Sequence, residues 1–231
     1  VDRITPKVVL QDVVDGFRYL VGNRGMLIVL SYAILINFVL SPTGSFLPLL
    51  VTRHFQGGVW HLGLLESLSG AGMIAGGLLL GVWGGFKRRV WNTVTAIGVL
   101  GCSILMVGIA PADAFPFAAA FIFLSGMSTT VMDGALISLT QAIVQPDMQG
   151  RVFSLILTGG GVASPLGLMI AAPIAEKLGV QSWYIFCGVI AMLLAGVSLF
   201  IRDLMHIEDQ MPVSENQNSS ITGCPEPGKL D

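Results

Sequence analysis

The sequence predicts an all-α integral membrane protein, and three observations lead to that prediction. Only 11% of the 231 residues are charged and 53% are hydrophobic, whereas a soluble domain carries about 25% charged residues. None of the long apolar stretches alternates between polar and apolar residues as a β-barrel strand does. Six stretches, each long enough to cross a bilayer, contain no Asp, Glu, Lys or Arg: 26–52, 67–86, 90–112, 114–132, 152–175 and 178–201. Because lipid offers no hydrogen-bond partner to the backbone, these stretches should be six transmembrane helices.

Residues 1–24 precede the first span and mix charged with apolar residues. Val9, Val13 and Phe17 fall at helical spacing beside Asp12 and Asp15. This spacing predicts either an amphipathic helix that lies against the membrane or other protein, or an ordinary helical lead-in to the first span. The segment has no signal-peptide pattern, and the missing initial Met suggests that the chain does not begin at a natural start.

The first span contains polar residues and two prolines. Asn37, the run SPTGS at 41–45 and Pro48 interrupt its apolar sequence. A proline in a membrane helix frees a backbone carbonyl, which is tolerated where it faces protein or a cavity. This span therefore either lines a cavity or has a simple packing kink.

Small residues recur every four positions in three later spans. Gly77, Gly81 and Gly85 form such a stripe in the second span, and Ala163, Gly167 and Ala171 form one in the fifth; the fourth span has a similar stripe that begins at Gly126. Such stripes let helix backbones approach closely, so we expect them to be helix-packing surfaces. In a transporter, these smooth faces are also where helices slide during gating.

The loops are short and the end of the chain is polar. The sequence predicts a membrane bundle over residues 25–202 and a disordered tail over 203–231, since that tail is rich in Pro, Ser and Asn. Cys102, Cys187 and Cys224 lie far apart and form no CxxC pair, so free thiols are expected and no metal or other cofactor.

Basic residues predict the orientation in the membrane. Six helices put both termini on one side, which then holds ten of the 12 Lys and Arg residues. Only Arg53 and Lys177 fall on the other side. Because cytoplasmic loops carry the excess of basic residues, both termini are expected in the cytoplasm, in the inner membrane of a cell.

Two halves of the chain resemble each other. Spans one to three and spans four to six have similar lengths, and each half has a basic element at a cytoplasmic turn, FKRR in one and QGR in the other. Three helices followed by three inverted helices is a repeat found within transporters. The sequence therefore predicts a 3+3 inverted repeat.

Four segments together carry a resemblance to a known family. They are DVVDGFRYLVGNRGM, NFVLSPTGSFLPLLVTRHFQGG, LGLLESLSGAGMIAGGLLLG and QPDMQGRVFSL. In order and spacing they resemble the C-terminal half, helices seven to twelve, of major facilitator transporters, and most closely the bacterial drug-efflux branch that includes macrolide exporters. The resemblance covers roughly residues 10–202. It implies alternating access, proton-coupled export of a small amphipathic compound, and a partner formed by an N-terminal six-helix half.

The chain also departs from that family pattern. Gly81 is followed by Gly85 where the family's cytoplasmic signature has an acid, and then by Lys87, Arg88 and Arg89. The fifth span has Ser164-Pro165 where the antiporter signature has Gly-Pro.

Two acidic residues lie in or beside the spans, where ionisable groups are functional candidates. At about 1.5 Å per residue, Glu66 lies about 30 Å from Phe86, near the outer interface, and Asp133 lies about 28 Å from Ala114, near the cytoplasmic face. Neither is expected at the midplane, so a proton-coupling acid would lie in the partner half. Asp133 is either a hydrated interfacial acid or part of a cytoplasmic gate, and the gate candidates are Lys87, Arg88, Arg89, Asp133 and Arg151.

Polar residues near the middle of the bundle are the candidates for contact with a substrate. They could bind a substrate or hydrogen-bond across helices, and they are Asn37, Ser41, Thr43, Ser125, Ser128 and Thr129.

Three functions fit these observations: half of a secondary exporter, a six-helix carrier or channel that acts as a homodimer, and a membrane scaffold without transport activity. No catalytic triad or phosphate-binding GxxxxGK[ST] loop occurs, so neither an enzyme nor a nucleotide-driven pump is expected. No basic stripe with interleaved aromatics indicates nucleic-acid binding. The expected partners are lipid and a small-molecule substrate.

Overall fold

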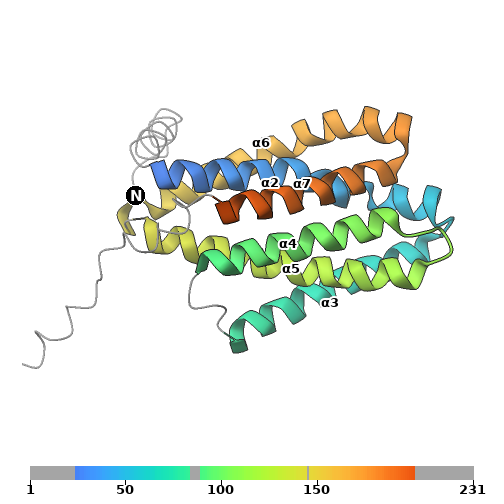
Figure 1. Cartoon of the computed structure of the whole chain (residues 1–231), viewed down its shortest axis with the longest axis horizontal. Coiled ribbons are helices and arrows are strands. Elements are labelled where there is room, and N and C mark those ends of the chain that lie inside the picture. The colour runs from blue at the N-terminus through green and yellow to red at the C-terminus, as the bar shows by residue number, and fades with distance from the viewer. Residues whose placement is uncertain (1–23, 84–88, 145, 201–231) are drawn as a thin grey trace, which may run out of the picture.

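The computed structural model describes residues 24–83, 89–144 and 146–200, and these form a bundle of long helices with no strand among them (Figure 1). The predicted lead-in at 1–24 and tail at 203–231 lie outside the described residues, apart from Arg24. Six helices are long and apolar enough to cross a membrane, which agrees with the number predicted. In chain order the elements are α2 (Arg24–Leu49), the π-helix η1 (Leu50–His54), α3 (Val59–Trp83), α4 (Arg89–Ile109), α5 (Phe115–Ile143), α6 (Pro146–Leu178) and α7 (Val180–Phe200).

Three helices extend beyond the charge-free stretches that predicted them. The helix α3 starts at Val59 rather than 67 and includes Glu66, and α5 continues past 132 to Ile143 and includes Asp133. The helix α6 starts at Pro146 rather than 152. A search for uncharged stretches stops at each charged residue, whereas a helix can carry such a residue at the interface or inside the bundle.

The first membrane helix is not broken by its prolines. The helix α2 continues through Pro42 and Pro48 and changes to π-helical geometry only at Leu50. Pro42 is buried. Because proline has no backbone N–H, the Phe38 carbonyl oxygen loses its hydrogen-bond partner within the helix. This oxygen and the Pro42 ring both face Gly167 of α6. The freed carbonyl thus faces protein rather than lipid.

Several helix contacts recur when the first three helices are exchanged with the last three, although the contact between α6 and α7 has no counterpart of similar extent between α3 and α4. The helix α3 packs on α5 as α6 packs on α2, and α4 packs on α5 as α7 packs on α2. The helices α4 and α7, which are equivalent in this exchange, pack on each other (Figure 1). This is the contact pattern of a 3+3 inverted repeat.

Glycines at positions 72 and 76 let α3 and α5 approach closely. A β-carbon on Gly72 or Gly76 would overlap the carbonyl oxygen of Phe123 or Met127. By contrast, Gly81 has no atom within 4 Å of such a β-carbon, and Gly77 has only the Thr130 methyl group at 3.8 Å. No described helix packs closely at Gly81, and Gly85 lies outside the described residues, so close helix packing at Gly77, Gly81 and Gly85 stays a prediction.

Small residues also line the contact between α2 and α6. A β-carbon on Gly167 would overlap the Phe38 carbonyl oxygen, and Ala163 and Ala171 are buried. These residues give α6 a smooth face over the middle of α2, which is how membrane helices pack without a hydrophobic driving force between them.

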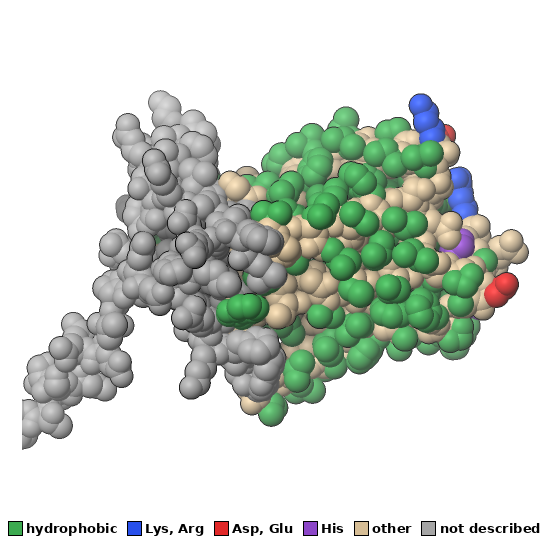
Figure 2. Space-filling model, in the orientation of Figure 1, with side chains coloured by type: hydrophobic (Ala, Val, Ile, Leu, Met, Phe, Trp, Pro, Cys, Tyr) green, Lys and Arg blue, Asp and Glu red, His purple; other side chains and the backbone are tan. Residues whose placement is uncertain are grey.

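The outer surface suits a lipid environment. Large apolar side chains are exposed along α3, α6 and α7, and hydrophobic side chains cover most of the described face in Figure 2. The described Lys, Arg and His side chains visible in Figure 2 lie at one end of the bundle. The last turn of η1, with Arg53 and His54, and the last turn of α6, with Lys177, lie at this end.

Candidate substrate cavity

A cavity of about 410 Å³ lies between α2 and α5. These two helices are not among the closely packed pairs: α2 packs against α6 and α7, and α5 packs mainly against α3 and α4, so each contacts chiefly helices of the other half. Leu100 and Ile104 of α4 and Tyr184 of α7 close one side of the cavity, and Ser69 and Met73 of α3 contribute to the wall. The two helices that correspond in the repeat, α2 and α5, are thus separated by a space.

Five of the six residues predicted to contact a substrate line this one cavity. Asn37, Ser41 and Thr43 come from α2, and Ser125 and Thr129 come from α5. The sixth, Ser128, does not: its side chain is 3% exposed, and its hydroxyl donates to the Leu124 carbonyl oxygen at 2.9 Å. The structure brings the other five residues together, and their contact with a substrate stays a prediction.

Most hydroxyl protons in the cavity lining are already used within the protein. The Thr43 hydroxyl donates to the Leu40 carbonyl at 2.5 Å, the Ser125 hydroxyl to Ile122 at 2.8 Å, and the Thr129 hydroxyl to the Ser125 carbonyl at 2.9 Å. Each hydroxyl has one proton and two lone pairs. These groups therefore offer the cavity mainly hydrogen-bond acceptors.

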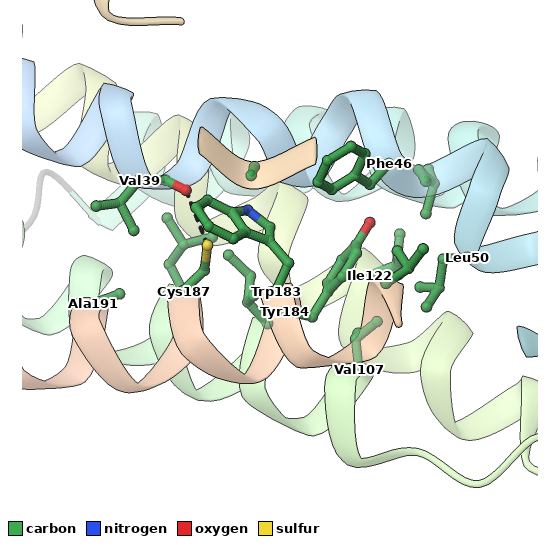
Figure 3. Packing of buried hydrophobic residues seen from close by; sticks show 14 of the residues in the cluster. Val39, Phe46, Leu50, Val107, Ile122, Trp183, Tyr184, Cys187 and Ala191 are labelled. Atoms are coloured by element: carbon green, nitrogen blue, oxygen red, sulfur yellow. Dashed lines mark hydrogen bonds between the residues drawn. The ribbon is translucent and has the colours of Figure 1, made fainter. Parts of the chain in front are cut away.

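Tyr184 is a cavity residue that the sequence did not reveal. It is 3% exposed, and its hydroxyl donates to the Thr43 carbonyl oxygen at 2.6 Å. One turn along α7, the Cys187 thiol donates to the Val39 carbonyl oxygen at 3.0 Å (Figure 3). Both side chains point from α7 toward α2 and hold the backbone of the cavity wall. The only signal in the sequence that could have indicated Tyr184 as a cavity residue is its polar hydroxyl within an otherwise apolar span.

The Ser41 hydroxyl hydrogen-bonds to the Ser164 hydroxyl of α6. Ser164 belongs to the Ser-Pro pair that replaces Gly-Pro in the fifth span. The helix α2 is therefore held by polar side chains from both α6 and α7 along one short stretch of the cavity wall.

Asp133 lines the cavity together with Thr129 and Met132. The sequence placed it near the cytoplasmic face, as an interfacial acid or a gate residue, and did not include it among the residues expected to contact a substrate. Its side chain is exposed, and it has no hydrogen bond or ion pair with the residues that the structure describes. The other gate candidates, the side chains of Lys87, Arg88, Arg89 and Arg151, lie outside the described part. Pairing with Asp133 stays a prediction.

At the end of the bundle opposite Asp133, His54 links its own turn to the turns at Ala110 and Gln181. His54 Nε2 lies 2.9 Å from the Ala110 carbonyl oxygen and 2.8 Å from the Gln181 side-chain amide. The Phe55 and Phe115 rings meet edge to face nearby. Over the described residues, no cluster of His, Cys, Asp and Glu could hold a metal ion.

The profile of the Major Facilitator Superfamily matches residues 26–221. The chain belongs to the Major Facilitator Superfamily. Members of this superfamily are membrane transporters and are in general not enzymes. The chain is accordingly a multi-pass membrane protein of a family found in bacterial cell membranes, and six helices in its described part are long and apolar enough to cross a membrane.

Several relatives within the superfamily are similar along most of the chain. Macrolide efflux protein A of Streptococcus pyogenes is 28% identical over 199 residues, which is 86% of this chain and 49% of that protein. Macrolide efflux protein A of Enterococcus faecalis is 30% identical over 159 residues, 69% of this chain and 49% of that protein. An uncharacterized MFS-type transporter of Bacillus subtilis, YfiS, is 25% identical over 221 residues, 91% of this chain and 51% of that protein. The chain thus spans about half the length of the curated relatives it matches.

Proposed function

We propose that this chain is one half of a secondary active transporter that exports small amphipathic compounds by alternating access. The observation that carries the proposal is the cavity between α2 and α5, because it combines apolar walls with hydroxyl and amide groups inside a membrane bundle. Binding sites for small molecules have this composition. Its position between the equivalent helices of an inverted repeat is where transporters bind their substrates. The names of the relatives favour export as the direction.

The exposed faces of α3 and α6 support a missing partner half. Gly63, Gly70 and Gly77 of α3 repeat every seven residues, and no atom lies within 4 Å of a β-carbon at Gly63 or Gly70. Gly161 of α6 is equally open. Open glycine faces allow another membrane helix to approach closely. An N-terminal six-helix half that packs on these faces would cover them and close the cavity on its open side.

Polar residues exposed on α2 also support a second unit that packs against this chain. Asn37, Gly44 and Ser45 are exposed, although they lie within a span. Polar groups at membrane depth are tolerated where they face protein or water rather than lipid. A second copy of this chain would also cover them, which makes a homodimeric carrier the alternative. A scaffold without transport activity would require no access to the cavity.

Transport assays in cells separate these functions. Accumulation of a fluorescent amphipathic dye should fall in cells that produce this chain with a matching N-terminal half, and not in cells that produce either part alone. Thr129→Trp should abolish export by filling the cavity, whereas the same change at Thr95, which is exposed on α4, should leave it intact. Strong export by this chain alone would favour the homodimer. Equal effects of the two tryptophans would contradict transport through this cavity.

We further propose that export is coupled to protons, as the family resemblance implies. Collapsing the proton gradient with an ionophore should then restore dye accumulation to the level of cells without the transporter. Continued export under these conditions, with the membrane potential also abolished, would exclude proton coupling.

A further inference from the structure

A second hollow, which we call the apolar groove, lies alongside the first turns of α3 and α5 and has a volume of about 450 Å³. Leu64 and Leu68 of α3 line it on one side, and five residues of α5 between Phe115 and Phe123 line it on the other. None of these side chains carries a charge, an N–H group or an O–H group. Because a buried water needs about two to four polar partners, the groove suits an apolar occupant.

The apolar groove faces away from the cavity between α2 and α5. Successive residues of a helix are rotated by about 100°, so residues nine positions apart point in opposite directions. Leu64 is nine residues from Met73 on α3, and Ala120 is nine residues from Thr129 on α5. Met73 and Thr129 line the cavity, whereas Leu64 and Ala120 line the groove. The two hollows therefore lie on opposite sides of the contact between α3 and α5.

The groove also lies away from the face of α3 where we expect a partner half. Gly63 and Gly70 belong to that face, and no atom lies within 4 Å of a β-carbon at either position. Leu68 is five residues from Gly63 and two from Gly70. It therefore points about 140–160° away from both glycines. The rim of the groove instead continues into Trp60, one turn before Leu64, which is 82% exposed. Tryptophan is enriched where a protein crosses the membrane interface, so lipid borders the groove.

The length of the groove matches one leaflet of a bilayer. Phe115 and Phe123, at its two ends, are eight residues apart, which is about 12 Å along a helix. One leaflet contributes half of a hydrocarbon core of about 30 Å. At the mouth of the groove, the Phe115 and His61 rings meet edge to face with their centroids 4.9 Å apart. At its inner end, a β-carbon on Gly72 would overlap the Phe123 carbonyl oxygen, so the two helix backbones touch there and close the groove.

We propose that the apolar groove binds an acyl chain of a phospholipid from the leaflet at this end of the bundle. The chain lies along the helices, between the leucines of α3 and Phe123 of α5, and the headgroup lies at the level of Trp60 and His61. Lipid offers no hydrophobic driving force toward a groove, so the preference comes from packing. An unfilled groove forfeits the van der Waals contacts of its lining, and a flexible, unbranched chain restores them. This site is independent of the proposed transport function.

Photolabelling by a lipid tests this site directly. The full 231-residue chain would be placed, one copy per nanodisc, in zwitterionic phospholipid with a small fraction that carries a diazirine midway along one acyl chain. After irradiation, peptide mass spectrometry locates the labelled residues. Phe123 in the groove and Val189 on α7 are compared, because both lie about 12–14 Å along their helices from the same end of the bundle. Val189 is 43% exposed and Phe123 is partly buried. Labelling at Phe123 should nevertheless exceed labelling at Val189 severalfold, whereas exposure to bulk lipid alone predicts the reverse.

Two substitutions in the groove lining remove the site in different ways. Ala120→Trp fills the groove and should lower the labelling at Phe123 to the level at Val189. Leu64→Asn places an amide in the lining without adding bulk, so it should lower the labelling severalfold even if the tryptophan disturbs folding. Ala172→Trp is the matched control, because Ala172 is exposed on α6 at a similar distance from the same end of the bundle. This control should leave the labelling at Phe123 unchanged.

Several outcomes would overturn the assignment. Labelling at Phe123 that is no greater than at Val189, or that survives both groove substitutions, would show contact with bulk lipid only. Loss of this labelling in nanodiscs that hold two copies of the chain would identify a second copy as the occupant of the groove. Loss of it when an N-terminal six-helix half completes the transporter would identify that half as the occupant instead.

Discussion

At the scale of single residues, side chains of α7 hydrogen-bond to backbone carbonyls of α2 in the cavity wall. The oxygens of Val39 and Thr43 accept hydrogen bonds from Cys187 and Tyr184 of α7 on either side of Pro42. Pro42 itself frees the Phe38 carbonyl oxygen, which faces Gly167 of α6, so α6 and α7 both contact the backbone of α2 along this stretch. The wall of the cavity is thereby fixed by its neighbour and does not depend on α2 alone.

Removing one of these bonds should have a small, measurable effect on stability. Tyr184→Phe keeps the ring and removes only the hydroxyl, so we expect a loss of about 0.6–1 kcal/mol in the free energy of unfolding. Denaturation of the purified protein in mixed micelles measures this loss. Ser182→Ala is the control, because the Ser182 hydroxyl is exposed and donates within α7 to the Leu178 carbonyl. Equal effects of the two substitutions would contradict a stabilising role of the bond between α7 and α2.

At the scale of helices, the contact between α3 and α5 depends on which glycines face the partner. The sequence shows seven glycines in the second span, and several pairs among them have the four-residue spacing of a packing stripe. Spacing alone cannot tell which face is directed at α5. Gly72 and Gly76 have this spacing as well, and they are the ones against Phe123 and Met127. The orientation of α3 about its axis is set by packing with α5, whose own Gly126 lies against the Ser69 backbone.

Alanine substitutions distinguish the two glycine faces. Gly76→Ala should destabilise the chain by about 2 kcal/mol or more, since the new methyl group would overlap the Met127 carbonyl oxygen. Gly81→Ala meets open space, so it should be neutral or stabilise the helix by roughly 0.5–1 kcal/mol. Thermal unfolding in detergent compares the two. A larger loss at Gly81 than at Gly76 would show that α3 is rotated relative to the structure described above.

The sequence predicted the number of helices and much of the cavity lining for a common physical reason. A charged residue is rare in lipid, so uncharged stretches identify spans, and polar residues inside a span mark the face that avoids lipid. This reasoning does not separate Ser128, which lies outside the cavity lining, from its neighbours, and it did not point to Asp133 as a lining residue. Ser128 satisfies its hydroxyl on the Leu124 carbonyl and needs no cavity, and Asp133 reaches the cavity because α5 continues well beyond the uncharged stretch.

At the scale of the whole molecule, the helices alternate in direction, so the ends of α2 and α7 that lead to the termini lie at one end of the bundle (Figure 1). The distribution of basic residues then predicts that this end is cytoplasmic. A membrane-impermeant thiol reagent applied to intact cells should modify a cysteine introduced at Gly58, which is exposed in the turn between η1 and α3, and should spare the native Cys224. Modification of Cys224 from outside, with Gly58→Cys unmodified, would reverse the orientation.

The central claim is that the space between α2 and α5 is a water-accessible cavity rather than a surface covered by lipid. Cysteines at Ser125 and Val189 compare the two environments, because both positions lie about 15 Å along their helices from the same end of the bundle. Ser125 lines the cavity, and Val189 is 43% exposed on α7. The background would lack Cys102 and Cys224 and retain the buried Cys187. In membranes that contain the complete transporter, a water-soluble maleimide should modify Ser125→Cys and leave Val189→Cys unmodified; failure to modify Ser125→Cys, or equal modification of both, would contradict a transport cavity at this site.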